Sequence, residues 1–150
     1  MGDNDNILIR NKKAFHDYQI LESFEAGIEL RGTEVKSCRQ RNISLADTYV
    51  KIQEGEAFLL NAHISPYEHG NRFNHDPRRE RRLLLRKREI RKLHQQTREK
   101  GCTIVPLRFY LKKGRVKVEV ALAKGKTKGD KREDLKRKDD ERTMRRAISR

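Results

Sequence analysis

The sequence is poor in long hydrophobic runs and in cysteine, and each shortage excludes a class of protein. No apolar run is longer than four residues, so no segment approaches the roughly 20 apolar residues of a transmembrane helix. The apolar stretch Ile7–Ile9 is too short for the core of a signal peptide. The two cysteines, Cys38 and Cys102, are isolated and indicate no disulfide framework. We therefore expect a cytoplasmic protein with no membrane segment.

Acidic residues are scarce relative to basic ones. The 150 residues include 37 Lys and Arg but only 22 Asp and Glu, which gives a formal net charge of +15. A charge of this size attracts polyanions, and nucleic acid is a better candidate than a membrane surface. The composition therefore favours an RNA- or DNA-binding protein.

The densest basic run spans residues 74–92, where the acids are Asp76, Glu80 and Glu89. Its basic residues are Arg78, Arg79, Arg81, Arg82, Arg86, Lys87, Arg88, Arg91 and Lys92. Removing a guanidinium group from water without a partner is costly, so we expect these arginines to face outward while Leu83–Leu85 anchor the run in the core. The planar donors of the arginines match phosphate. Leu84 shares one strand face with Arg82 and Arg86 at period two, so we expect Leu84 itself on the outer, RNA-binding face. The alternative is a solvated, salt-bridged surface, which the shortage of acids disfavours.

Motifs of catalysis and metal binding are scarce. The sequence has no P-loop, dinucleotide fingerprint or nucleophile elbow. The histidines from His69 to His75 have neither the usual spacing of zinc ligands nor a nearby cysteine. The carboxylates that a nuclease could use do not pair closely in sequence, namely Glu25, Glu29, Glu34 and Asp47. We therefore predict no enzymatic activity, no metal and no cofactor.

Alternating apolar residues predict mainly β structure. Residues 18–30 indicate a strand with a bend or bulge at Gly27. Two hairpins are predicted, 44–53 with 56–65 and 103–111 with 115–123. Their turns are Glu54-Gly55 and Lys113-Gly114. Such small antiparallel sheets commonly curl into a barrel, and the oligonucleotide-binding type suits a basic exterior.

Two helices are predicted between the strands. One begins with Thr33 as its N-cap and runs to Arg39, and the other spans 87–100 and ends at Gly101. Residues 69–82 are expected to form an exposed loop. Residues 126–150 lack an apolar face and are expected to be a basic tail, disordered until bound to a partner. The predicted organisation is a flexible arm over 1–14, a barrel domain with two or three short helices over 15–125, and the tail.

Several motifs occur in an order typical of one family. They are Glu25–Ser37 (EAGIELRGTEVKS), Ile64–Tyr67 (ISPY), Asp76–Arg79 (DPRR), Leu83–Leu85 and Gly125–Asp134 (GKTKGDKRED). In this order the chain resembles the SsrA-binding protein (small protein B) family over residues 11–140. Two departures stand out. Arg41 occupies a position where the family usually has glycine, so the first helix must be capped in another way, for which Asn42 is the candidate. Gly129 replaces the usual aromatic residue or histidine.

The resemblance implies a bacterial, non-enzymatic adaptor of trans-translation, monomeric and cytoplasmic. It would bind the tRNA-like domain of transfer-messenger RNA and bring it to stalled ribosomes, working indirectly with the elongation factor that carries the aminoacylated RNA. The tail would enter the message channel near the decoding region of the small-subunit ribosomal RNA. An ordinary ribosomal or RNA-chaperone protein with a basic tail is the alternative that composition leaves open.

The expected RNA-binding residues fall on the barrel and the tail. The family positions implicated in binding match Glu25, Leu84 and Lys117. With the basic candidates, the barrel set is His16, Glu25, Lys36, Arg78, Arg79, Arg82, Leu84, Lys117 and Lys124. The tail set for the ribosome is Asp130, Lys131, Arg132, Lys136, Arg137 and Lys138.

Overall fold

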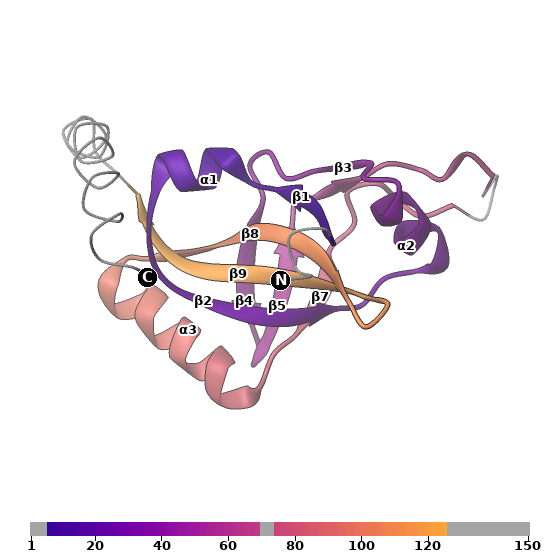
Figure 1. The fold of residues 1–150 in the computed structure, drawn as a ribbon. Helices are drawn as coiled ribbons and strands as arrows, with labels where there is room; N and C mark the ends of the chain where they lie inside the picture. The colour runs from indigo at the N-terminus through magenta and orange to yellow at the C-terminus, as the bar shows by residue number, and fades with distance from the viewer. Residues whose placement is uncertain (1–5, 70–73, 126–150) are drawn as a thin grey trace.

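The computed structural model describes residues 6–69 and 74–125, and its body is a barrel of antiparallel strands (Figure 1). Strands pair in the order β8, β4, β5, β7, β2 and β9, and β9 pairs in turn with β8, so the ring of pairings closes. The strands are β1 (Ile7–Arg10), β2 (Tyr18–Ile28), β3 (Ile43–Ser44), β4 (Tyr49–Gln53), β5 (Glu56–Leu60), β6 (His63–Ile64), β7 (Arg81–Leu84), β8 (Thr103–Lys112) and β9 (Arg115–Gly125). The predicted barrel is confirmed.

Three helices in the described residues surround the strands: α1 (Lys12–Asp17), α2 (Gly32–Arg39) and α3 (Lys87–Lys100). Figure 1 shows α1 and α3 on opposite sides of the strands, with α2 beyond the end where β8 turns into β9. The predicted helix over 87–100 is confirmed, and Gly101 ends it with a left-handed φ of 63°. No helix in the described part of the chain is long and apolar enough to span a membrane.

Both predicted hairpin turns are confirmed. Glu54 and Gly55 have φ of 52° and 75°, and Lys113 and Gly114 have φ of 52° and 76°. Two successive residues with positive φ are the signature of the turn whose twist matches that of paired strands. These turns set the registers of β4 with β5 and of β8 with β9, which direct alternate side chains into the barrel.

The interior of the barrel is apolar. Residues from several strands are almost completely removed from solvent there, including Leu59, Ile104, Phe109, Val118 and Val120. Leu93 extends this core to α3. Burial of these side chains supplies the main driving force for folding.

The N-terminal segment differs from the prediction. Residues 1–14 were expected to form a flexible arm, but β1 pairs with β8, and α1 follows at once. Asn11 fixes this corner: its side-chain nitrogen donates to the carbonyl of Pro106 at 2.9 Å and its side-chain oxygen accepts from the backbone of Ala14 at 3.1 Å. The ordered body therefore begins well before residue 15.

The start of α2 and the position of the bulge in β2 also differ from the prediction. Arg31, not Thr33, is the N-cap residue of α2, and its backbone N–H donates to the carboxylate of Glu34 at 2.8 Å. The irregularity in β2 lies between Ile20 and Glu22, whereas Gly27 pairs regularly with both neighbouring strands. The predicted bulge at Gly27 is therefore wrong.

The C-terminal end of α2 is closed by Arg41 itself. Arg41 adopts a left-handed φ of 62°, and its N–H donates to the carbonyl of Cys38 at 2.9 Å. The next N–H, of Asn42, donates to the carbonyl of Ser37 at 3.0 Å. Asn42 thus contributes through its backbone, while the left-handed position that suits glycine is occupied by an arginine.

Replacing Arg41 by glycine is expected to stabilise the protein by up to about 1 kcal/mol. The left-handed conformation costs a residue with a Cβ roughly 1–2 kcal/mol, and the greater chain entropy of glycine in the unfolded state offsets part of that gain. Urea unfolding of Arg41→Gly beside Arg41→Ala measures this. An alanine variant as stable as the glycine variant would show that the conformation at residue 41 carries no strain.

Candidate nucleic-acid interface

The barrel surface brings Glu25, Leu84 and Lys117 together. Gly27 of β2 pairs with Leu84 of β7 on one side and with Lys117 of β9 on the other, and Glu25 lies two residues earlier in β2. A hollow of about 530 Å³ lies here, and we call it the β2 hollow. It is lined by Glu25, Gly27, Leu84, Leu85, Arg86, Glu89 and Lys117.

Leu84 lies on the surface of the β2 hollow. Its side chain is 48% exposed, whereas the preceding Leu83 points into the core and is 2% exposed. A Cβ placed on Gly27 would lie 3.2 Å from the Cβ of Leu84, a tight contact that Leu84 would have to shift by a few tenths of an ångström to relieve. An exposed leucine resting on a glycine gives the β2 hollow an apolar floor against which a base or sugar can pack.

The carboxylate of Glu25 lies beside this apolar surface and is held in place by neighbouring side chains. The Tyr110 hydroxyl donates a hydrogen bond to it, and the Lys112 amine lies 3.2 Å from both carboxylate oxygens. The Tyr110 hydrogen bond and the Lys112 charge outweigh the opposing effect of burial and lower the pKa of Glu25 below its ordinary value. Burial, followed by the hydrogen bond to Glu25, raises the pKa of Tyr110. Glu25 is therefore ionised at neutral pH and suited to accept a hydrogen bond from a base amino group or a ribose hydroxyl, not to contact phosphate.

The two arginines nearest to Leu84 in sequence, Arg82 and Arg86, have different surroundings. Arg82 is half-exposed and forms ion pairs with Glu29 and Glu56, each at 3.0 Å. Arg86 is the exposed N-cap residue of α3. Arg82 and Leu84 face solvent at alternate positions of β7, as predicted, whereas Arg86 lies beyond the end of that strand and is not part of its face.

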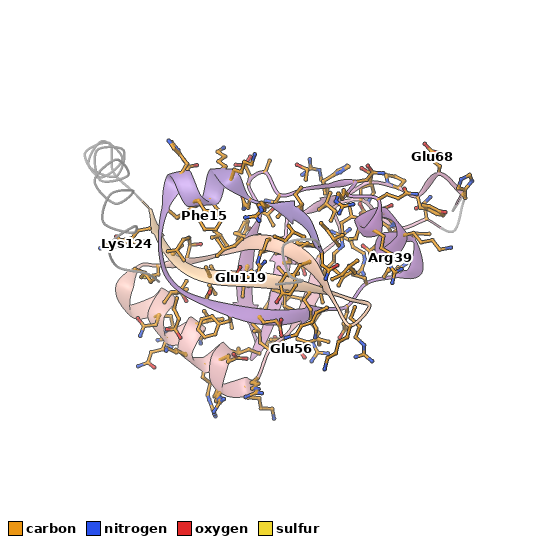
Figure 2. All side chains as sticks on the ribbon, viewed as in Figure 1. Phe15, Arg39, Glu56, Glu68, Glu119 and Lys124 are labelled. Carbon is orange, nitrogen blue, oxygen red and sulfur yellow. The ribbon has the colours of Figure 1, made fainter. Side chains whose placement is uncertain are left out.

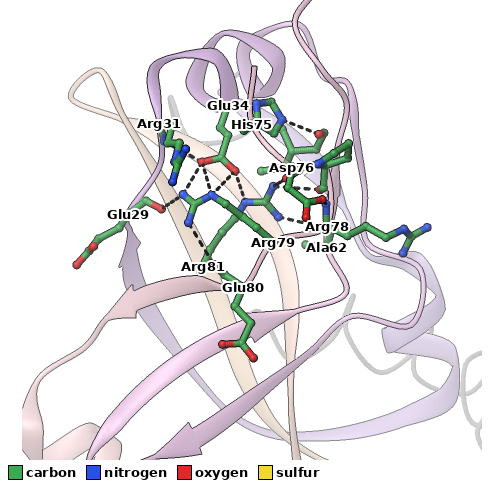
Figure 3. A network of polar contacts seen from close by, with 12 residues as sticks. Glu29, Arg31, Glu34, Ala62, His75, Asp76, Arg78, Arg79, Glu80 and Arg81 are labelled. Carbon is green, nitrogen blue, oxygen red and sulfur yellow. Dashed lines mark hydrogen bonds and ion pairs between the residues drawn. The ribbon is translucent and has the colours of Figure 1, made fainter. Parts of the chain in front are cut away.

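The prediction that the arginines of residues 74–92 face outward is wrong for Arg81. Arg81 is completely buried, and its Nε lies 2.5 Å from the carboxylate of Glu34, which is also completely buried (Figure 3). The remaining Arg81 donors reach the carbonyls of Ala62 at 2.9 Å and Pro77 at 3.0 Å. The guanidinium is tolerated inside because its charge is paired and its donors are satisfied.

Arg79 belongs to the same network. Its Nη2 lies 2.6 Å from Glu34, and it also donates to the backbone carbonyls of Glu29 and Glu80 (Figure 3). These contacts bind α2 to the segment before β7. The geometry gives Arg79 a structural task, and its contribution to RNA binding stays a prediction.

The expected exposed loop over 69–82 is also wrong at His75. This side chain is 5% exposed, and its Nε2 donates to the carbonyl of Ile64 at 2.8 Å. Its Nδ1 forms a second hydrogen bond, with the Thr33 hydroxyl at 2.8 Å, in which the neutral ring accepts because Nε2 carries the proton. Thr33 therefore holds this segment against α2 instead of capping the helix.

The other predicted site residues lie at two separated ends of the barrel. Lys36 of α2 lies over the Tyr67 ring at 5.2 Å, and Arg78 is exposed in the turn before Arg79. His16 of α1 pairs with Asp17 at 2.9 Å, near the end of β9 that carries Lys124. Figure 2 shows Lys124 at one end of the molecule and Arg39 of α2 at the other. The structure therefore does not unite all of them with the β2 hollow, and the predicted tail residues lie outside the described part of the chain.

Sequence reasoning missed Tyr110 and Lys112. Tyr110 is buried in β8, but its hydroxyl reaches the surface carboxylate of Glu25. The Arg108 guanidinium lies 4.6 Å from the centre of the Tyr110 ring and pairs with Glu119 at 2.8 Å. Only the pairing of β8 and β2 with β9 reveals this arrangement, because the partners are 85 residues apart in sequence.

Leu84→Ala is expected to weaken binding of a tRNA-like RNA about tenfold while changing the free energy of unfolding by less than about 0.5 kcal/mol. The neighbouring variant Leu83→Ala removes a buried side chain and should cost about 2–5 kcal/mol of stability, so it serves as the matched control. Gel-shift titration and urea unfolding measure the two effects. Unchanged affinity in folded Leu84→Ala would exclude the β2 hollow as an RNA site.

The closed antiparallel ring and the basic composition place the chain among barrel proteins of the oligonucleotide-binding type. Comparison with known proteins gives the family: the model of the SmpB protein family matches residues 8–150. The chain belongs to the SmpB family.

Similar proteins span nearly the whole chain. The SsrA-binding protein of Latilactobacillus sakei is 57% identical over 143 residues, covering 95% of this chain and 92% of that protein. The SsrA-binding protein of Geobacillus thermodenitrificans is 56% identical, again covering 95% of this chain and 92% of that protein. A solved chain described as "tmRNA-SmpB: a journey to the center of the bacterial ribosome" is 44% identical, with a TM-score of 0.68, and covers 85% of this chain and 93% of that one.

Proposed function

We propose that this chain is an RNA-binding adaptor of trans-translation. It binds the tRNA-like domain of transfer-messenger RNA and delivers that RNA to stalled ribosomes. The observation that carries the proposal is the meeting of Glu25, Leu84 and Lys117 in the β2 hollow, in a chain whose 44% identical structural neighbour is described as tmRNA-SmpB in the ribosome.

The chemistry of the β2 hollow suits RNA more than DNA or protein. Lys117 and Arg86 supply positive charge for phosphate, Leu84 supplies an apolar surface, and ionised Glu25 accepts hydrogen bonds. The ribose 2′-hydroxyl is the donor that distinguishes RNA from DNA at such a carboxylate. The hollow thus combines positioning by charge with recognition of a sugar or base edge.

We assign the two ends of the chain different tasks. The barrel binds the RNA, and residues 126–150 act at the small-subunit ribosomal RNA in the decoding region. The elongation factor carrying the aminoacylated RNA joins the complex through that RNA. In this role the protein works as a monomeric, non-enzymatic partner of RNA in the cytoplasm.

Capture from a bacterial lysate tests the proposal. Tagged protein should enrich one small tRNA-like RNA far above its share of cellular RNA, and Leu84→Ala should lose that enrichment. Stoichiometric recovery of ribosomal RNA by both forms, without enrichment of a small RNA, would instead identify an ordinary ribosomal or RNA-chaperone protein.

A further inference from the structure

Helix α3 has one buried face and one basic face. Leu93 is completely buried and Ile90 is 8% exposed, so this side packs on the barrel. Arg88, Arg91 and Arg98 are exposed, and their spacing of three and seven residues places them along one side of a helix. We call these three arginines the α3 ridge.

The α3 ridge lacks the acidic partners found by arginines elsewhere on the barrel. Arg82 pairs with two glutamates, and Arg108 pairs with Glu119. Among the side chains that the structure describes, no carboxylate is within ion-pair distance of the ridge arginines. The nearby Lys92 is paired with Glu22 at 2.7 Å and is not counted in the ridge. The ridge is therefore a cationic surface whose charge the described part of the protein leaves uncompensated.

Helix α3, which carries the ridge, begins beside the β2 hollow. Arg86 and Glu89, at the start of α3, line the hollow, and Glu89 accepts a hydrogen bond from the backbone N–H of Arg86 at 3.0 Å. From Arg88 to Arg98 the helix rises about 15 Å away from that end. An RNA seated in the hollow can therefore extend along the helix.

The composition of α3 favours contacts with phosphate over stacking with bases. Residues 87–100 contain no Phe, Tyr or Trp, so the exposed imidazole of His94 is the one ring in the helix on which an unpaired base could stack. Guanidinium groups match phosphate oxygens with two parallel hydrogen bonds. A row of such groups suits the regular phosphates of a double-stranded stem better than the bases of a single strand.

We propose that the α3 ridge binds the phosphate backbone of a base-paired stem of the RNA that occupies the β2 hollow. The inference rests on the proposed function and extends it to a second surface. The ridge holds the stem in register without reading its sequence, while the hollow supplies recognition. Its contribution therefore depends strongly on salt and little on base identity.

The test compares two triple variants that remove the same charge. Arg88→Gln, Arg91→Gln and Arg98→Gln together remove the ridge, and glutamine keeps a helix propensity close to that of arginine. The control combines Arg10→Gln, Lys12→Gln and Lys51→Gln, three exposed cations that lie on other elements, β1, α1 and β4. Affinity for a transcript of the tRNA-like domain is measured between 50 and 300 mM salt, and circular dichroism checks the fold of each variant.

The ridge variant should bind about 10- to 100-fold more weakly near 150 mM salt, and the slope of log affinity against log salt should fall in magnitude by roughly 2–3. Base-pair exchanges within the stems should leave the ridge contribution unchanged. Equal loss of RNA affinity in the ridge and control variants would overturn the proposed role of the ridge. The affinity would then depend only on the overall positive charge of the protein. Failure of the unmodified protein to bind the transcript would instead overturn the proposed function.

A photo-crosslinking amino acid in place of Gln95, which is exposed in the same helix, supplies a second readout. In complexes with the tRNA-like transcript and ribosomes, it should join the protein to nucleotides of a base-paired stem. Cross-links to a ribosomal protein instead of RNA would overturn the proposal and identify the ridge as a surface for an acidic protein.

Discussion

Glu34→Ala should destabilise the protein by about 3–5 kcal/mol, because it leaves Arg81 buried without its counter-ion. Both side chains are completely buried, and Glu34 also holds Arg79 and the N-terminus of α2. Domains of this size are commonly stable by about 5–15 kcal/mol, so the variant would lose a large fraction of its stability. Urea unfolding measures the change.

Glu29→Ala is the matched control for this experiment. Glu29 also pairs with an arginine, Arg82, but their side chains are 51% and 45% exposed. An exposed pair of this kind contributes about 0–1 kcal/mol. Similar losses in the Glu34 and Glu29 variants would show that the buried network does not hold α2 to the barrel.

The same network predicts that the free energy of unfolding depends on pH in the acidic range. Burial alone raises the pKa of Glu34, but hydrogen bonds from Arg79, the Arg31 backbone and Arg81 outweigh it and hold the pKa below its ordinary value of 4.5. A carboxyl group with a lowered pKa in the folded state adds stability above its unfolded pKa, and that stability is lost as pH falls through the folded pKa. Unfolding below pH 4.5 should therefore be less steeply pH-dependent in Glu34→Gln than in the unmodified protein.

Removal of the residues after Lys128 should abolish ribosome rescue while leaving the barrel intact. Strand β9 ends at Gly125, and the buried apolar residues of the described chain lie between Leu8 and Ala123. The truncated protein should therefore unfold within about 0.5 kcal/mol of the full chain and still bind the tRNA-like transcript. It would lack the cations that we assign to the ribosomal RNA channel, namely Lys131, Arg132, Lys136, Arg137, Lys138, Arg142, Arg145 and Arg146.

Tagging of stalled chains in a reconstituted translation system measures this effect. A full-length variant with the same eight cations changed to glutamine is the matched control, because it keeps the length of the chain. Both forms should fail to support tagging. Tagging at the full rate by the truncated protein would show that residues after Lys128 are dispensable and that the barrel alone performs the rescue.

The parts of the fold predicted from sequence are those fixed by local interactions. The hairpin turns at Glu54-Gly55 and Lys113-Gly114 and the C-terminal end of α3 at Gly101 depend on residues only a few positions apart. Alternation along β7 likewise predicted that Leu84 faces solvent and Leu83 faces the core. Local patterns were sufficient at these positions because no distant partner competes with them.

The parts that sequence reasoning missed depend on distant partners. Arg81 was placed on the surface because its counter-ion, Glu34, is 47 residues away in sequence. Thr33 was taken as a helix cap because its actual partner, His75, is equally remote, at 42 residues. The strand β1 was missed because only four residues form it and its pairing with β8 spans most of the chain. For the same reason the hydrogen bond between Tyr110 and Glu25 could not be inferred.

A map of ultraviolet cross-links between the protein and RNA in living bacteria tests the central claim most directly. We expect cross-linked peptides around Leu84 and Lys117 joined to the tRNA-like part of one small RNA, and peptides from residues 126–150 joined to small-subunit ribosomal RNA. Cross-links from the β2 hollow spread over ribosomal RNA, with no enrichment of a tRNA-like RNA, would contradict it.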